Sequence, residues 1–128
     1  MSDVTDPGVW VAYAEDDYAM ARSALRRKRP IVYGICFHAQ QCAEKYLKAV
    51  LVARKQAFPK THDLRALSTL CTKAGASLGL DVIDLDRLSE HAVWARYPGD
   101  VPTLDEAKAA LTYARAVRRS VRKLLNVK

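Results

Sequence analysis

The sequence predicts an all-α protein, an up-and-down bundle of four to five helices. Apolar residues recur at helical spacing in several long segments, and no run alternates with a period of two for long enough to form a strand. Prolines and glycines separate these segments. Half of the 128 residues are apolar, which is enough to bury one core. We therefore expect residues 1–128 to form a single domain.

The first helix is expected from Pro7 to about Arg27. Proline is well tolerated in a first turn, because the amide hydrogen it lacks would have no partner there. Glu15, Asp16 and Arg22 are expected to face water. The opposite face carries apolar residues at helical spacing, namely Trp10, Tyr13, Met20, Ala21, Ala24 and Leu25.

A second helix is expected from Ile31 to Lys55, and its composition makes it the central one. Most of its circumference is apolar, which is typical of a helix packed on several sides. These apolar residues are Ile35, Cys36, Ala39, Cys42, Ala43, Tyr46, Leu47, Ala49, Val50 and Ala53. One polar stripe remains, made of Gln40, Gln41, Glu44, Lys45 and Lys48. Within it, Glu44 precedes Lys48 by four residues, which is the favourable order for an ion pair.

A third helix is expected to begin within the segment Thr61-His62-Asp63-Leu64. The Thr61 hydroxyl can cap free amide groups, and Asp63 then lies in the first turn, where a negative charge is favourable. Gly75 suits the end of this helix, because glycine readily adopts the left-handed backbone that closes helices.

Two further helices complete the predicted bundle. The fourth is expected from about Asp84 to the segment Tyr97-Pro98-Gly99. The segment Thr103-Leu104-Asp105-Glu106 has the S/T-x-x-E form of a capping box and predicts the start of the fifth helix. The inward face of that helix comprises Ala107, Ala110, Leu111, Ala114, Val117, Val121 and Leu124.

The chain is basic, with 21 lysines and arginines, 14 acidic residues and a net charge of +7. Such a field favours acidic partners, including RNA. A second interpretation stays open, in which these residues are solvated and complement helix dipoles. The excess lies at Arg26-Arg27-Lys28-Arg29 and at Arg115, Arg118, Arg119, Arg122 and Lys123.

Other function classes find no support in the sequence. No stretch approaches the roughly 20 apolar residues that cross a bilayer, and the first residues are acidic, unlike a signal peptide. We therefore expect a cytoplasmic protein with no membrane partner. Cys36, Cys42 and Cys71 have no paired spacing and are expected in the core. Because residues 36 and 42 face different sides of a helix, we expect neither a metal site nor a cofactor.

Three segments together resemble one family. The string from Phe37 to Ala49, Phe-His-Ala-Gln-Gln-Cys-Ala-Glu-Lys-Tyr-Leu-Lys-Ala, resembles the second-helix signature of HEPN domains. The segments Thr61-His62-Asp63-Leu64 and Ala95-Arg96-Tyr97-Pro98 agree with the family in order and spacing. The resemblance implies a bundle of four to five helices, a homodimer with a polar cleft, and a minimal nucleotidyltransferase encoded nearby as a possible partner.

Many HEPN proteins are toxins of toxin–antitoxin pairs that cut RNA without a metal. In these, an arginine is followed, after four to six intervening residues, by a histidine. The arginine can hold a phosphate while the histidine moves the proton of a ribose 2′-hydroxyl. Here Arg96 stands where the motif arginine belongs, but residues 97–103 contain no histidine, and Arg87 has only three residues before His91. The catalytic motif of the family is therefore absent as written.

The resemblance nevertheless suggests site residues. Arg96 is either an anion-binding residue of the cleft or a helix-closing residue paired with Asp100. His62 either belongs to the cap of the third helix or acts with Arg96 in catalysis. For His38 a structural role and a cleft role both stay open. The predicted catalytic pair is Arg96 and His62, and the predicted binding and cleft residues are Gln41, Glu44, Lys45, Lys48, His38 and Tyr97.

Three functions remain open at this point. The first is a dimeric module of a toxin–antitoxin-like pair that binds RNA, a nucleotide or a nucleotidyltransferase. The second is a metal-independent ribonuclease toxin in which Arg96 works with His62 or His91. The third is a purely structural helical domain.

Overall fold

The structure is a computed structural model that describes residues 5–95, 98–99 and 101–128. Within these residues the chain forms helices and no strand, which confirms the predicted all-α class. The helices are α1 (Pro7–Arg26), α2 (Val32–Ala53), α3 (Leu64–Lys73), α4 (Val82–Trp94) and α5 (Leu104–Leu124).

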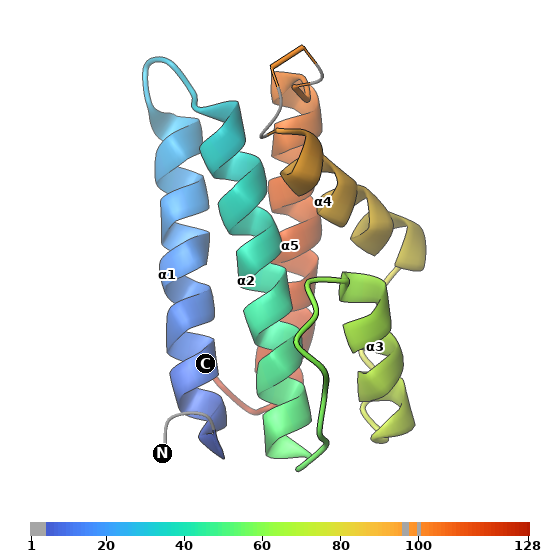
Figure 1. The fold of residues 1–128 in the computed structure, drawn as a ribbon. Coiled ribbons are helices and arrows are strands. Elements are labelled where there is room, and N and C mark those ends of the chain that lie inside the picture. Colours follow the sequence, from blue (N-terminus) through green and yellow to red (C-terminus); the bar gives the residue numbers. More distant parts are fainter. Residues whose placement is uncertain (1–4, 96–97, 100) are drawn as a thin grey trace.

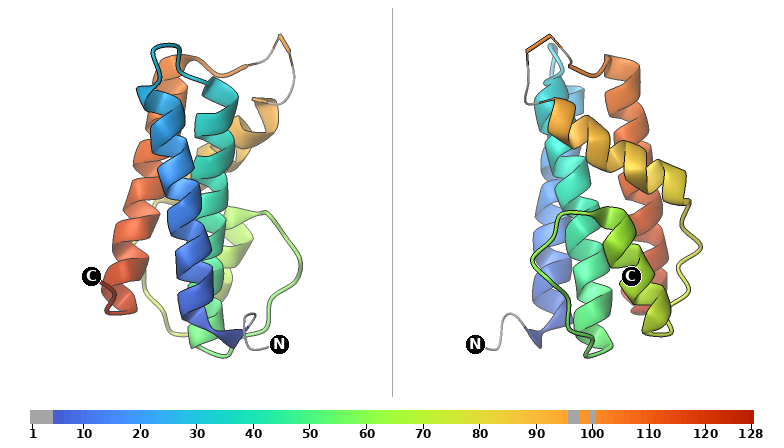
Figure 2. Two further views of the ribbon diagram at one scale, coloured as in Figure 1. Left: turned by 90° about the vertical axis from the view of Figure 1, so that its left-hand side faces the viewer. Right: turned by 45° about the vertical axis from the view of Figure 1, so that its right-hand side comes forward.

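The helix α2 is the centre of the bundle, as its apolar circumference predicts. The three long helices α1, α2 and α5 lie side by side, and the shorter α3 and α4 cover the remaining side of α2 (Figure 1). Two further views show the same arrangement (Figure 2). Because α2 contacts each of the other four helices, every other element depends on it for its position.

The chain departs from strict alternation after α2. Residues 54–63 run back along α2 before α3 begins, so α3 points in the same direction as α2 (Figure 1). Alternation therefore holds for α1, α2, α4 and α5. The link carries Phe58, whose ring packs edge-on against Trp10 of α1, with 6.3 Å between the ring centroids. This contact closes the link over the end of the α1–α2 pair.

Three helices end in the same left-handed turn. After α2, Lys55 has a φ of 55°, and the amide of Gln56 donates to the Leu51 carbonyl at 2.8 Å. Gly75 and Asn126, with φ of 82° and 59°, close α3 and α5 in the same way. This is the Schellman arrangement, which satisfies carbonyl groups that a helix end leaves free. Only the glycine was predicted, because lysine rarely marks such a turn.

The helix starts are capped by side chains. The capping box of α5 is confirmed: the Glu106 amide donates to Thr103 Oγ1 at 3.1 Å, and the Thr103 amide donates to Glu106 Oε1 at 2.9 Å. For α3 the predicted cap was wrong by two residues. Asp63 is the N-cap and accepts from the Arg65 amide at 3.0 Å, while Thr61 Oγ1 accepts from the Asp63 amide.

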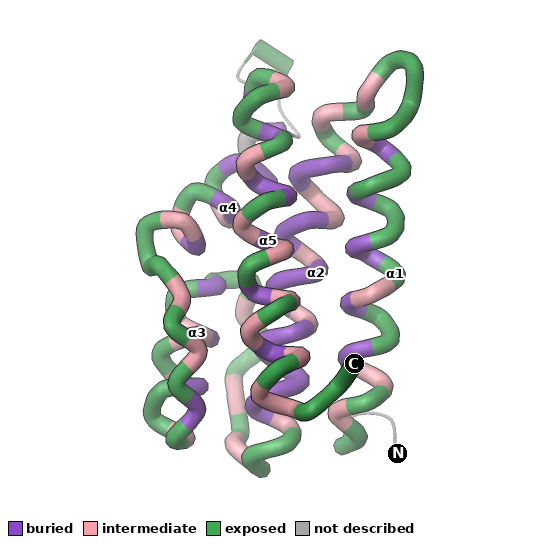
Figure 3. Tube along the Cα trace, turned by 180° about the vertical axis from the view of Figure 1, so that it is seen from behind, coloured by how far each residue is buried: buried purple, intermediate pink, exposed green. Residues whose placement is uncertain are grey.

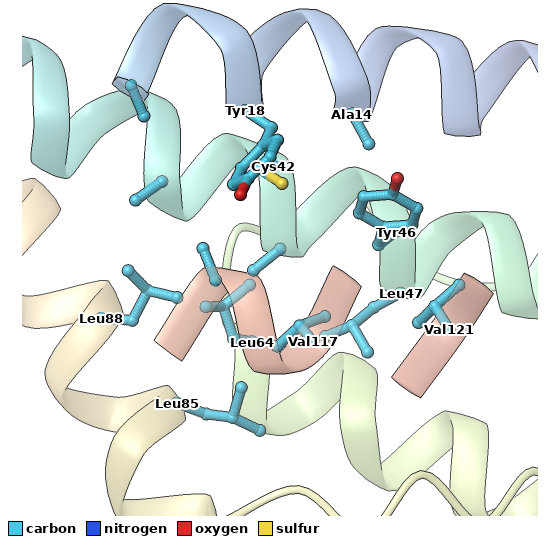
Figure 4. Close-up of a cluster of buried hydrophobic side chains, with 14 of the residues drawn as sticks. Ala14, Tyr18, Cys42, Tyr46, Leu47, Leu64, Leu85, Leu88, Val117 and Val121 are labelled. Atoms are coloured by element: carbon cyan, nitrogen blue, oxygen red, sulfur yellow. The ribbon is translucent and has the colours of Figure 1, made fainter. Parts of the chain in front are cut away.

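The core is formed where the other four helices meet α2. Figure 3 shows buried positions along most of α2, whereas the outer edge of α1 is exposed. Figure 4 shows Tyr46 and Leu47 of α2 among side chains from each of the other helices. Alanines on α1 allow its close approach to α2, and a Cβ placed on Gly34 would lie 3.3 Å from the Cβ of Ala24. Every predicted inward residue of α5 is buried except Leu124, which is half-buried.

The carboxylate of Glu15 ties α1 to α2 and α5, contrary to the expectation that it faces water. Arg118 donates to it twice, from Nε at 2.7 Å and from Nη2 at 2.9 Å. The hydroxyl of Tyr46 also donates to Glu15 and accepts from Arg122 Nη1 at 3.1 Å. The hydrogen bond from Arg118 lowers the pKa of Glu15 below its ordinary value of 4.5, although burial opposes the shift. Burial raises the pKa of Tyr46, so the phenol remains a donor.

The lowered pKa of Glu15 predicts a loss of stability in acid. As the pH falls, Glu15 is protonated in the unfolded chain before it is protonated in the folded protein. Its contribution to the free energy of unfolding is therefore complete above about pH 4.5 and is lost as the pH falls through the lower folded-state pKa. We expect Glu15→Gln to cost about 1–3 kcal/mol at pH 7. We also expect its difference from the wild type to shrink towards pH 3 in urea unfolding. Asp16→Asn, on the exposed neighbour, should leave the pH profile unchanged, and equal profiles for all three proteins would contradict the Glu15 account.

Candidate functional site

The polar stripe of α2 is divided between two buried carboxylates. Glu44, on α2 itself, is 3 % exposed, and Asp17, on α1, is also 3 % exposed. A buried carboxylate must be paired and hydrogen-bonded to be tolerated. Each of the two therefore recruits a different part of the stripe, and the two groups face different neighbours.

Glu44 is surrounded by three donors. Lys48 Nζ donates to Oε2 at 3.0 Å, which confirms the predicted ion pair but places it in the interior and not on the surface. The ring of His62 lies with Nδ1 2.8 Å from Oε1, and Gln40 Nε2 donates to the same oxygen at 3.2 Å. Gln40 Nε2 also donates to the His62 carbonyl at 3.0 Å. We call these four residues, Gln40, Glu44, Lys48 and His62, the Glu44 cluster.

His62 combines a fixed ring with an accessible edge. Its Nδ1 faces a carboxylate, which only accepts, so Nδ1 carries the hydrogen and Nε2 of the neutral ring is an acceptor. The side chain is 82 % exposed. His62 is therefore not part of the α3 cap, one of its predicted roles, because its ring is held by Glu44 of α2.

A pocket of about 350 Å³ lies beside the Glu44 cluster. It brings together α2, α4 and the link before α3. Gln41 Nε2 donates to Gln40 Oε1 at 2.8 Å, which leaves Gln41 Oε1 without a hydrogen-bond partner among the described residues. Within that same part of the chain, the buried Ser89 Oγ also has none. The lining residues are Phe37, Gln40, Gln41, His62, Ser89, Ala92 and Val93.

Asp17 holds the other predicted cleft residues away from this pocket. Lys45 Nζ lies 2.5 Å from Oδ2, and His38 Nδ1 lies 2.8 Å from Oδ1. Both partners line the seam between α1 and α2, and neither lines the pocket. Their geometry favours the structural interpretation of His38. Sequence reasoning missed Asp17, although it stands one helical turn before the buried Ala21 on the predicted apolar face of α1. Tyr13 was also predicted on that face but is 57 % exposed.

The remaining predicted residues fall elsewhere. Arg96 and Tyr97 lie outside the described residues. His91 is buried at 7 % exposure, with Nε2 3.6 Å from Glu106 Oε2 and Nδ1 without a described partner. It lines a separate hollow between α4 and α5. His62 is therefore the histidine that the fold places at the Glu44 pocket.

The described residues contain no group of three or more His, Cys, Asp or Glu side chains suited to a metal ion. None of their helices is both long enough and apolar enough to span a bilayer. The three cysteines are free and buried, as predicted. Burial raises the pKa of Cys36 and of Cys71 to about 11 and that of Cys42 further, so they remain protonated thiols.

Comparison with known families decides the assignment. The HEPN domain model matches residues 8–124, which is nearly the whole chain. The chain belongs to the HEPN domain family. Neither the curated proteins nor the solved structures gave a significant match. HEPN membership fits the five-helix fold and supports a general role related to RNA or nucleotides.

The Glu44 cluster predicts a specific pattern of stability losses. Glu44→Gln leaves the Lys48 ammonium buried without its counter-charge and should cost about 3–5 kcal/mol. Adding Lys48→Met removes the second charge too, so the double variant should recover much of that loss. The exposed change Glu90→Gln should stay within about 0.5 kcal/mol of the wild type. Urea unfolding measures all three variants, and a double variant that is no more stable than Glu44→Gln would contradict the account.

Proposed function

We propose that this HEPN domain is an RNA- or nucleotide-binding module whose pocket beside the Glu44 cluster accepts a nucleobase. One observation carries the proposal: Ser89, whose buried hydroxyl oxygen has no described partner, lines the same pocket as Gln41, whose amide oxygen has no described partner either. A buried polar group without a partner calls for an explanation, and a ligand supplies one.

The pocket has the chemistry of a base site. A hydroxyl both donates and accepts, and an amide oxygen accepts, so Ser89 and Gln41 can pair with the edge of a base. Phe37, whose ring is stacked on Tyr33, brings aromatic surface to the pocket wall, and proteins that bind single-stranded RNA commonly place bases against such rings. The His62 Nε2 edge supplies an additional acceptor. The Lys45 and Lys48 ammonium groups are paired with buried carboxylates, so their proposed role is to position neighbouring side chains.

A homodimer forms part of the proposal. Tyr33 and Val93 are 45 % and 51 % exposed, although large apolar side chains favour burial. The ring of Tyr33 stacks on the pocket residue Phe37, with 5.9 Å between centroids. A second copy seated on this apolar rim would turn the pocket into a cleft between subunits, which is the arrangement expected from the HEPN resemblance.

The wider setting is proposed from the family resemblance. We propose that residues 1–128 act as one domain in a toxin–antitoxin-like pair, with a minimal nucleotidyltransferase as partner. We also propose a cytoplasmic location. Three free thiols support it, because free cysteines are typical of reducing compartments.

RNA binding by pocket variants tests the proposal. Gln41→Leu and Ser89→Ala each remove one base-pairing group, so each should weaken binding of a labelled single-stranded RNA about 3- to 30-fold, as expected for about 0.7–2 kcal/mol. Fluorescence anisotropy at fixed salt measures this affinity. Glu90→Gln, an exposed change on the same helix as Ser89, serves as the control. If wild-type and pocket variants bind with one affinity, or the wild type binds neither RNA nor nucleotides, the proposal is wrong.

A second candidate function rests on the contact between Glu44 and His62. A buried carboxylate that fixes one nitrogen of an exposed imidazole leaves the other nitrogen placed for proton transfer. In a metal-independent ribonuclease, His62 would take the proton of a ribose 2′-hydroxyl while that oxygen attacks phosphorus. The 5′-oxygen would leave with a proton from water, and the other product would be a 2′,3′-cyclic phosphate. Arg96 is proposed to hold the phosphate in that reaction.

The ribonuclease candidate makes its own prediction. RNA should be cut in the presence of a chelator, a strand with a 2′-deoxyribose at the cleavage position should survive, and His62→Ala and Arg96→Ala should each abolish cutting. Lys60→Ala, two residues from His62 and exposed, should cut like the wild type. Equal cleavage by the Arg96→Ala protein would exclude this candidate.

A further inference from the structure

Three guanidinium groups gather around one phenol ring between α1 and α5. The carbon at the centre of each guanidinium lies 4.5 Å from the Tyr18 ring centroid for Arg118, 5.5 Å for Arg22 and 6.0 Å for Arg115. Tyr18 and Arg22 belong to α1, and the other two arginines belong to α5. We call these four residues the arginine seam. Cation–π contact explains the attraction of each arginine to the ring, but not three cations together.

The charge of the arginine seam is not balanced within the described residues. Glu15 is the carboxylate at its edge, and it is already bound by Arg118 at 2.7 Å and approached by Arg122 at 3.6 Å. Neither Arg22 nor Arg115 has a described carboxylate within ion-pair distance. Glu15 thus pairs with only two of the four arginines, and the positive charge that remains favours an added anion.

Unused hydrogen-bond donors lie around the same ring. Arg115 donates from Nε to the Tyr18 hydroxyl at 3.1 Å, which leaves both of its Nη groups without a described acceptor. The Tyr18 hydroxyl accepts this bond, and its own hydrogen has no described acceptor. Arg22 is exposed, with its guanidinium likewise unengaged by any described acceptor. Planar guanidinium forks are the groups that proteins use to bind phosphate oxygens.

We propose that the arginine seam binds a phosphate group, between Arg22 and Arg115 and beside Tyr18. The inference deepens the proposed function, because the backbone of RNA is one source of such a group, and free polyphosphate is another. Arg26 lies one helical turn beyond Arg22, and Arg119 lies one turn beyond Arg115. Because α1 and α5 run in opposite directions, a chain of phosphates could continue one way along α1 and the other way along α5 (Figure 1).

The arginine seam is distinct from the pocket beside the Glu44 cluster. In Figure 3, α1 lies on one side of α5, whereas α3 and α4 lie on the other. The pocket is built from α2, α4 and the link before α3, and none of its lining residues comes from α1 or α5. An RNA long enough to reach both places would have a base in the pocket and a backbone phosphate at the arginine seam.

Inorganic pyrophosphate is the probe that tests the arginine seam itself. At constant ionic strength, titration should shift the Nε signals of Arg22 and Arg115 in ¹⁵N NMR with one saturable affinity. Replacing both, as Arg22→Gln with Arg115→Gln, should weaken that affinity at least tenfold. Lys73→Gln with Lys108→Gln removes the same charge from exposed positions elsewhere and should change it less than twofold. Arg22→Gln alone changes an exposed position and should give an intermediate loss of pyrophosphate affinity. This single variant tests the proposal even if the fold does not accept the Arg115 change.

A parallel titration with single-stranded RNA distinguishes the RNA backbone from free polyphosphate as the source of the phosphate group. Each lost phosphate contact reduces the slope of log affinity against log salt by about 0.7, so the double arginine variant should lose about 1.4. Pyrophosphate that leaves both Nε signals unmoved, or binds the double variant equally, overturns the inference even if RNA binds at the pocket. Saturable pyrophosphate binding by a wild type that binds neither RNA nor nucleotides keeps the arginine seam and rejects the proposed function.

Discussion

The buried carboxylate of Glu44 on the central helix is the constraint on which the candidate site depends. A charge at 3 % exposure is tolerated only with close partners, and the fold supplies three of them. One partner, His62, comes from the link that runs back along α2. Compensation of this single charge therefore pins the link to α2 and places an imidazole beside the pocket. Stability and the geometry of the site have the same physical origin.

Two more carboxylates repeat this arrangement with a different result. Asp17 and Glu15 on α1 each collect basic partners from neighbouring helices, and these contacts close α1 against α2 and α5. Asp17 pairs with Lys45 of the α2 stripe, as Glu44 pairs with Lys48. Both lysines of the stripe are thus paired, whereas Arg22 on α1 and Arg115 on α5 have no described carboxylate within ion-pair distance. The proposed base site and the proposed phosphate site are therefore separated in space.

The sequence predicted the helices well because their signals are local. Apolar spacing gave α2 to within two residues at each end, and the capping box of α5 was readable from four adjacent residues. Contacts between distant segments were not predictable. The sequence indicated that the polar stripe forms one cleft wall, whereas the structure divides it between Glu44 and Asp17. This division was not predictable, because the partners Asp17 and His62 lie far from the stripe in sequence. Gln41 was selected with the cleft residues, but Ser89 carried no sequence signal of its own.

Side-chain NMR during titration with a single-stranded RNA tests the central claim most directly. The account predicts that the Gln41 amide signals and the His62 ring nitrogens shift together and saturate at one affinity. It also predicts that Glu44→Gln, which releases the His62 ring, uncouples the His62 response from that of Gln41. RNA that saturates the protein while both side chains keep their free-state signals would contradict the claim that the pocket beside Glu44 is the binding site.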